Sequence, residues 1–232
     1  MSASFGPFVY AKLDPPVRGF LHRPENPAGS GLVLVHGAGS SGQAPLLVAL
    51  AERLSARGLT VLRCDLPYRQ LRPYGPPRPG DAARDRQGIE HAVASLRSML
   101  AGALFLGGHS YGGRQSSMLC AEKPELVNGL LLLSYPLHPP GKAEQLRVQH
   151  FPRLRAPSLF AHGTRDPFGT VAEMENALRL IPVRTQLLAV VGAGHDLNAR
   201  KGQAGETVVN SILSAFEAFF ASGERAGAPP GP

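Results

Sequence analysis

A serine with glycines on both sides stands at position 110, within the segment 108–112 (Gly-His-Ser-Tyr-Gly). The apolar run 103–106 precedes it, and the composition of 114–122 favours a helix. A strand, a tight turn and a helix in this order can present a serine hydroxyl as a nucleophile. Glycines are needed because such a turn leaves no room for side chains two residues before and two residues after the serine. The segment therefore predicts a nucleophile at Ser110; the alternative is a flexible glycine turn in an ordinary strand-to-helix connection.

A nucleophilic serine needs a base that accepts its proton and an acid that orients the base. His195 is the predicted base, because it follows the last apolar run and because Gly192 and Gly194 leave its loop free to reach back. Asp166 is the predicted acid, at the exit of an earlier apolar run. Ser110, His195 and Asp166 are thus the predicted catalytic residues.

Other residues compete for these roles. His109 adjoins the serine, but on a sharp turn its side chain should point away from the reacting group. His162 also stands at a strand end, and we interpret it as packed beneath the acid loop. Asp65 and Asp196 are alternative acids. His195 itself has the alternative interpretation of a polar loop histidine.

An oxyanion that develops during attack on a carbonyl needs hydrogen-bond donors. The backbone N–H of Tyr111, the residue after the serine, is one predicted donor. The other is the N–H of Ala38, in the segment 36–39 (His-Gly-Ala-Gly) that follows the apolar run 31–35; Gly39 is the alternative. These residues would form the oxyanion hole.

Two irregular segments near the predicted strand ends would form the walls of the site: the proline-rich segment 67–80 and the segment 135–142. Arginine binds carboxylates and phosphates, and a histidine in segment 135–142 can contact a substrate. For the arginines, the alternatives are solvated side chains or ties between a helix and a loop. For the histidine, the flanking prolines favour the alternative of a structural turn. Whether segment 67–80 acts as a lid stays open. The predicted substrate-binding residues are Arg69, His138 and Arg114, with Arg72 and Arg78 as further candidates.

Apolar runs and helical segments alternate from residue 31 onward. This pattern predicts an α/β fold with a mostly parallel central sheet and helices on both faces. In such sheets ligands bind at the carboxyl ends of the strands, so the strand exits above belong to one site. Segment 66–79 is too rich in proline for a regular element. The expected strands are 8–13 and 17–21 (an antiparallel hairpin), 31–35, 59–65, 103–106, 129–134, 157–166 with its exit loop, and 186–191, and the expected helices are 43–57, 81–100, 114–122, 170–180 and 206–221.

The chain of 232 residues is long enough for one substantial core, and no change of composition marks a linker. We expect one domain over residues 1–221. The tail 222–232 is small, polar and proline-rich, so we expect it to be disordered. The formal charge of +7 comes from scattered residues without a run of five like charges, so we expect no nucleic-acid partner.

The composition also bears on location and cofactors. No apolar run reaches the length of a membrane span, and the first residues lack the pattern of a signal peptide; we expect no membrane partner and a cytoplasmic location. Cys64 and Cys120 cannot form a disulfide framework or a zinc site by themselves, and we expect buried free thiols. The predicted site implies no metal and no organic cofactor. The oligomeric state stays open.

Four motifs in a fixed order resemble the α/β-hydrolase superfamily over about residues 8 to 221. The chain order Ser110, Asp166, His195 is the order found in that superfamily. Segment 129–134 is followed by no insertion long enough for a helical cap, so the resemblance implies an α/β-hydrolase fold with no large cap domain. The motifs are His-Gly-Ala-Gly at 36–39, Gly-His-Ser-Tyr-Gly at 108–112, Gly-Thr-Arg-Asp at 163–166 and Gly-His-Asp at 194–196.

Segments 107–114 and 134–142 resemble a narrower group. This group has three kinds of member: testis-expressed protein 30; the third regulatory subunit of the NSL histone acetyltransferase complex, which is a different protein; and bacterial dienelactone hydrolase-like proteins. The resemblance implies a serine hydrolase that cleaves a small acyl ester or thioester through an acyl-enzyme, although a dienelactone hydrolase usually has a cysteine where this chain has Ser110. The alternatives are a scaffold for protein interaction, as the chromatin-complex relative suggests, and acyl transfer to an acceptor other than water.

Overall fold

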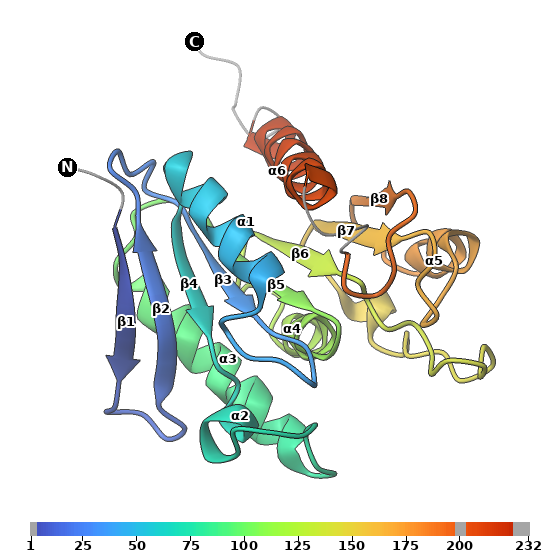
Figure 1. The fold of residues 1–232 in the computed structure, drawn as a ribbon, viewed down its shortest axis with the longest axis horizontal. Helices are drawn as coiled ribbons and strands as arrows, with labels where there is room; N and C mark the ends of the chain where they lie inside the picture. Colours follow the sequence, from blue (N-terminus) through green and yellow to red (C-terminus); the bar gives the residue numbers. More distant parts are fainter. Residues whose placement is uncertain (1–3, 198–202, 225–232) are drawn as a thin grey trace.

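The computed structural model describes residues 4–197 and 203–224, and its centre is a single eight-stranded sheet (Figure 1). The strand order is β1-β2-β4-β3-β5-β6-β7-β8. The six strands from β4 to β8 in this order are parallel, while β1 and β2 form an antiparallel hairpin at one edge. The predicted α/β fold is therefore confirmed. The strands are β1 (Ser4–Tyr10), β2 (Val17–Arg23), β3 (Gly31–Val35), β4 (Thr60–Cys64), β5 (Leu104–His109), β6 (Gly129–Leu133), β7 (Ser158–Gly163) and β8 (Thr185–Val190).

Helices cover both faces of the sheet (Figure 1). Apolar residues of α1 and α6 pack on one face, and those of α3, α4 and α5 pack on the other. The closing helix α6 ends three residues beyond the predicted boundary at 221, and residues 225–232 of the predicted tail lie outside the described residues. The helices are α1 (Pro45–Ala56), α2 (Pro67–Leu71), α3 (Asp81–Arg97), α4 (Tyr111–Glu122), α5 (Val171–Leu178) and α6 (Gln203–Glu224), with one short 3-10 helix, η1 (Phe151–Arg153).

Local chemistry explains where these elements lie. Strands β3 and β6 are apolar throughout and buried at every residue, as expected for central strands of a parallel sheet. Helix α1 begins with Pro45 at its first position, where the missing N–H costs no hydrogen bond. Helix α5 begins with a capping box in which the Thr170 hydroxyl accepts from the Glu173 N–H and the Glu173 carboxylate accepts from the Thr170 N–H.

The prediction that segment 66–79 holds no regular element was wrong, because helix α2 forms inside it. Pro67 stands at the start of this helix, where its fixed φ favours the first turn. The next N–H, that of Tyr68, donates to the buried carboxylate of Asp85, 3.0 Å away. A partner distant in the sequence thus stabilises a helix that local composition argues against.

The segment between β6 and β7, residues 134–157, contains only η1 as a regular element. Within the described residues, no large cap domain covers the carboxyl ends of the strands, in agreement with the predicted fold. Within residues 4–197 and 203–224, no helix has the length and hydropathy needed to cross a membrane.

A buried polar pair lies at the antiparallel edge of the sheet. Arg63 is buried, its guanidinium lies over the Phe20 ring, and its Nε donates to His22 Nε2, 2.9 Å away. This histidine nitrogen must therefore be unprotonated. Burial, together with the charge of Arg63, lowers the pKa of His22 from 6.5 to about 4.

Because only the unfolded chain takes up a proton on His22 as the pH falls through 6.5, the folded state loses stability on acidification. At pH 5 this group removes about 2 kcal/mol of unfolding free energy relative to pH 7. In His22→Gln, whose amide oxygen can accept from Arg63, we expect the loss between pH 7 and pH 5 to be smaller by about that amount. Urea unfolding at both pH values measures this; equal losses in the two proteins would contradict the assignment.

Candidate active site

Ser110 lies on a strained turn between the end of β5 and the start of α4. Its φ of 50° and ψ of −116° are unusual for a residue with a side chain. A Cβ on Gly108 would lie 2.5 Å from the Gly113 nitrogen, and a Cβ on Gly112 would lie 2.4 Å from the His36 oxygen. Both positions therefore require glycine, which is the steric argument made from the sequence.

The structure brings Ser110, His195 and Asp166 together at the carboxyl edge of the sheet. His195 Nε2 lies 2.7 Å from Ser110 Oγ, and its Nδ1 lies 2.8 Å from Asp166 Oδ2 and 3.0 Å from Oδ1. A carboxylate only accepts, so Nδ1–H donates to Asp166 and the Nε2 lone pair faces the serine hydroxyl. This tautomer can take the serine proton. The alternative acid Asp65 instead accepts from the Gly42 N–H, 2.7 Å away.

The loops that carry Asp166 and His195 are packed against each other. The N–H of Arg165 donates to the Ala193 oxygen at 2.9 Å, and a Cβ on Gly163 would lie only 2.4 Å from that same oxygen. The Asp166 carboxylate is fully buried and also accepts from the Phe168 N–H at 2.9 Å. The Phe168 ring lies against His195, with 4.2 Å between ring centroids. Acid and base are therefore held as one unit.

The histidine next to the serine contacts the His195 loop. His109 Nε2 lies 2.7 Å from the His195 backbone oxygen, so this nitrogen donates. Burial lowers the pKa of His109, which keeps the ring neutral. The side chain thus holds the base loop near the elbow, a role that the sequence reasoning did not assign to it.

His162 is fully buried beneath the acid loop, as interpreted from the sequence. Its Nε2 donates to the Gly169 oxygen at 2.7 Å, and its Nδ1 lies 3.8 Å from Asp166 Oδ2. His162 therefore supports the loop between Asp166 and α5.

The loop after β3, which carries Ala38, is held by buried polar groups. His36 Nε2 accepts from the Leu66 N–H at 3.0 Å, so His36 Nδ1 carries the proton and donates to the Gly37 oxygen at 2.8 Å. Burial lowers the pKa of His36 to about 4 and keeps this tautomer neutral. The Tyr68 hydroxyl donates to the Ala38 oxygen at 2.7 Å. The backbone orientation at Ala38 is therefore fixed from two sides.

Asp85 connects this loop to the elbow, and sequence reasoning missed it. Its fully buried carboxylate accepts from the Tyr68 N–H at 3.0 Å and from the Tyr111 hydroxyl at 2.7 Å. Burial raises the pKa of Asp85, and the two hydrogen bonds oppose that shift. The signal in the sequence is spacing: Asp85 stands one helical turn before Ile89, on the apolar face of α3, where an unpaired carboxylate is costly.

The predicted substrate residues have different environments. The Arg69 guanidinium donates to the backbone oxygens of Ser40 (2.7 Å), Arg72 (3.0 Å) and Gly75 (2.9 Å), and so ties segment 67–80 to the loop after β3. It also borders an open hollow of about 270 Å³ with Ser40 and Pro73. Substrate binding by Arg69 stays a prediction.

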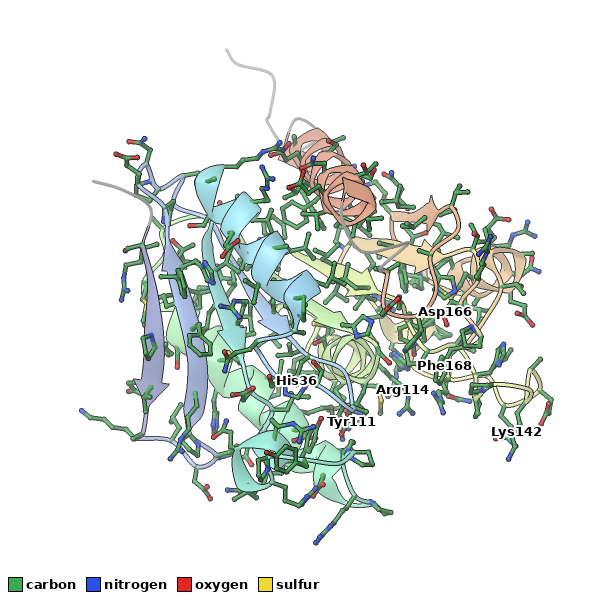
Figure 2. The ribbon with its side chains drawn as sticks, in the orientation of Figure 1. His36, Tyr111, Arg114, Lys142, Asp166 and Phe168 are labelled. Atoms are coloured by element: carbon green, nitrogen blue, oxygen red, sulfur yellow. The ribbon has the colours of Figure 1, made fainter. Side chains whose placement is uncertain are left out.

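His138 and Arg114 lie on the other wall. His138 is 6% exposed; its Nδ1 lies 2.8 Å from the Pro139 oxygen and its Nε2 lies 3.5 Å from Glu173 Oε2. Arg114 projects from the first turn of α4, on the side of the helix that faces Asp166 and Phe168 in Figure 2. Among the described residues, the buried Nε of Arg114 has no hydrogen-bond partner.

Both cysteines lie in the interior of the protein. Cys64 and Cys120 are free and buried, as predicted, and burial raises the pKa of Cys120 to about 12. Within the part of the chain that the structure describes, no three histidine, cysteine, aspartate or glutamate side chains form a group that could hold a metal ion.

The strand order, the elbow and the loops at the strand exits define an α/β-hydrolase fold. The chain belongs to the alpha/beta hydrolase domain family, whose model matches residues 28–221. The fold is similar to dienelactone hydrolase from Anabaena variabilis, with a TM-score of 0.74 and 23% identity over 94% of this chain and 99% of that one.

Two further solved structures share the fold. Est1E from Butyrivibrio proteoclasticus has a TM-score of 0.72 and 18% identity, over 93% of this chain and 99% of that one. XC6422 from Xanthomonas campestris, described as an α/β serine hydrolase without a lid, has a TM-score of 0.65 and 15% identity, over 99% of this chain and 97% of that one. At these identities the likeness shows the fold alone.

Asp85→Ala leaves two donors without their acceptor, so we expect it to lower the free energy of unfolding by about 2–4 kcal/mol. Tyr111→Phe should cost about 1 kcal/mol in the wild type and nothing in the Asp85→Ala background, because the hydroxyl has then already lost its partner. Urea unfolding of the four proteins measures this coupling. Additive effects would show that the hydrogen bond between the two side chains contributes no stability.

Proposed function

We propose that this protein is a serine hydrolase that cleaves a small acyl ester or thioester through a Ser-His-Asp triad. The observation that carries the proposal is the hydrogen-bonded chain from Ser110 Oγ to His195 Nε2 at 2.7 Å and from His195 Nδ1 to Asp166 Oδ2 at 2.8 Å. A strained serine on an elbow has no evident structural use, which also supports a nucleophile.

In the proposed reaction, Ser110 Oγ attacks the carbonyl carbon while its proton passes to His195 Nε2. The imidazolium that forms is stabilised by the buried carboxylate of Asp166. As the tetrahedral intermediate collapses, His195 returns the proton to the leaving alcohol or thiol, and an acyl-serine remains. Water then attacks this ester, again with His195 as base, and releases a carboxylic acid and free Ser110.

Stabilisation of the oxyanion is proposed for the backbone N–H groups of Tyr111 and Ala38. Tyr111 begins α4, where N–H groups of the first turn have no partner within the helix. Tyr68 and Asp85 link the residues that carry the two donors. Such rigid positioning suits donors that must be in place before charge develops.

The proposed substrate is a small molecule. It would reach Ser110 at the carboxyl edge of the sheet, where the described residues form no cap domain. The similar structures include a dienelactone hydrolase and Est1E, one structure of which contains ferulic acid. We assign this chain to the narrower group that contains testis-expressed protein 30, on the two segments 107–114 and 134–142. We also propose a cytoplasmic enzyme that binds neither nucleic acid nor membranes.

Acyl transfer is a second candidate, favoured by the open edge, because an alcohol or amine could reach the acyl-serine as water does. It uses the same residues. Hydrolysis in the presence of a competing alcohol separates the two: a transferase forms the new ester faster than the free acid.

We expect a fluorophosphonate probe to label the protein at Ser110, and short p-nitrophenyl esters to be hydrolysed. Ser110→Ala and His195→Ala should each abolish labelling and lower kcat by at least about 10³-fold, because neither the nucleophile nor its base can be replaced by water at that position.

Ser98→Ala, which removes a surface serine, is the matched control and should retain both labelling and activity. A folded wild type that neither reacts with the probe nor hydrolyses the esters would refute the proposed hydrolase activity and support the alternative of a scaffold for protein interaction. Circular dichroism of each variant confirms that loss of activity is not loss of fold.

A further inference from the structure

Arg114 lies one helical turn after the proposed nucleophile. Its N–H donates to the Ser110 oxygen at 2.9 Å, so the two residues begin the same helix. In Figure 2 its side chain lies on the side of α4 that faces Asp166 and Phe168. The guanidinium is only partly exposed, and its buried Nε finds no acceptor among the described residues. The Arg114 side chain does hydrogen-bond the Tyr135 hydroxyl, so a partly exposed cation is held one helical turn from the reacting serine by a neutral partner.

Arg147 approaches the same place from the segment after β6. Its N–H donates to the Leu137 oxygen at 2.8 Å, and its own oxygen accepts from the Tyr135 hydroxyl at 2.5 Å. The neighbouring His138 N–H donates to the Phe168 oxygen at 3.0 Å. Arg147 is therefore attached to segment 135–142, which is in turn attached to the loop that carries Asp166 and Phe168.

The two guanidiniums act on each other electrostatically. Burial, together with the nearby charge of Arg114, lowers the pKa of Arg147. Burial also lowers the pKa of His150, to about 4, and the charges of Arg114 and Arg153 act in the same direction. His150 is therefore neutral and binds the Ser117 hydroxyl at 2.8 Å. The positive charge around Arg114 therefore comes from arginines and not from His150.

No carboxylate compensates this charge in the described part of the chain. Neither Arg114 nor Arg147 has an aspartate or glutamate oxygen within 4.0 Å there, although other arginines such as Arg72 and Arg84 do form such ion pairs. The Tyr135 hydroxyl between them is neutral, since burial raises its pKa. Two partly buried cations that repel each other and lack a counter-ion are the arrangement expected of a site whose anion arrives with a ligand.

We propose that Arg114 and Arg147 form an anion-binding subsite beside Ser110, and that the substrate is an ester that carries a carboxylate or phosphate group. The inference rests on the proposed hydrolase function and names its substrate class. Guanidinium groups bind both kinds of anion in a bidentate manner, which would fix the orientation of the ester relative to Ser110. Both arginines are partly exposed, and their guanidinium groups supply the donors. The Arg114 side chain also hydrogen-bonds the Tyr135 hydroxyl, and Arg147 donates to the Pro136 oxygen at 3.3 Å, so protein contacts hold both cations in place.

A matched pair of esters tests the subsite. Mono-p-nitrophenyl glutarate carries a free carboxylate, and its methyl ester is the neutral counterpart with the same leaving group. We expect wild type to prefer the glutarate by at least about tenfold in kcat/KM, and Arg114→Met and Arg147→Met each to lower this preference about tenfold or more, mainly through KM. Inhibition of neutral-ester hydrolysis by free glutarate and by inorganic phosphate shows which anion binds more tightly.

Arg155→Met is the matched control, because it removes the same charge from an exposed arginine and should leave the preference unchanged. Arg147 lies in a loop, so its variant remains informative if Arg114→Met does not fold. Equal kcat/KM for the two esters in a wild type whose Ser110 reacts with fluorophosphonate would overturn the subsite and leave the hydrolase intact. A wild type that does not react with the probe and cleaves neither ester would overturn both.

Discussion

The close approach of the turn at Ser110 to its neighbours is the constraint on which the site depends. The backbone at positions 108 and 112 lies so near other main-chain atoms that only glycine fits. Because β5 pairs with β3 on one side and β6 on the other, this turn lies at the centre of the carboxyl edge. The remaining groups then have to come from neighbouring strand exits: the loop of Ala38 after β3, and those of Asp166 and His195 after β7 and β8.

Neutral histidines hold these loops in place. His36 and His109 each donate to a backbone oxygen, and burial lowers the pKa of both. The His109 ring, whose centroid lies 5.3 Å from that of His195, therefore adds no positive charge next to the base at neutral pH. This matters for the proposed reaction, since a cation beside His195 would oppose formation of its imidazolium. Burial of these side chains thus serves both the packing of the loops and the electrostatics of the site.

The sequence predicted the sheet, its helices and the meeting of Ser110, His195 and Asp166, because each depends on a local pattern and on the rule that strand exits share one edge. It did not predict α2 or the role of Asp85. Both depend on hydrogen bonds between residues far apart in the chain, and local composition at 66–79 pointed the other way. His109 was predicted to point away from the reacting group, but no local pattern shows that its ring reaches the His195 oxygen, 86 residues away.

The arginines show where such reasoning reaches its limit. Arg69 and Arg114 were selected by the same argument, yet their donors are used differently. Three backbone oxygens surround the Arg69 guanidinium, and they come from two loops whose meeting depends on the whole fold. Arg114 keeps a buried donor without an acceptor and has a second guanidinium nearby. What separates a structural arginine from a ligand-binding one is therefore the set of acceptors around it. That set is determined by tertiary structure. For Arg114 and Arg147 it contains a hydroxyl and a backbone oxygen but, among the described residues, no carboxylate, and this is why we propose that an anion binds there.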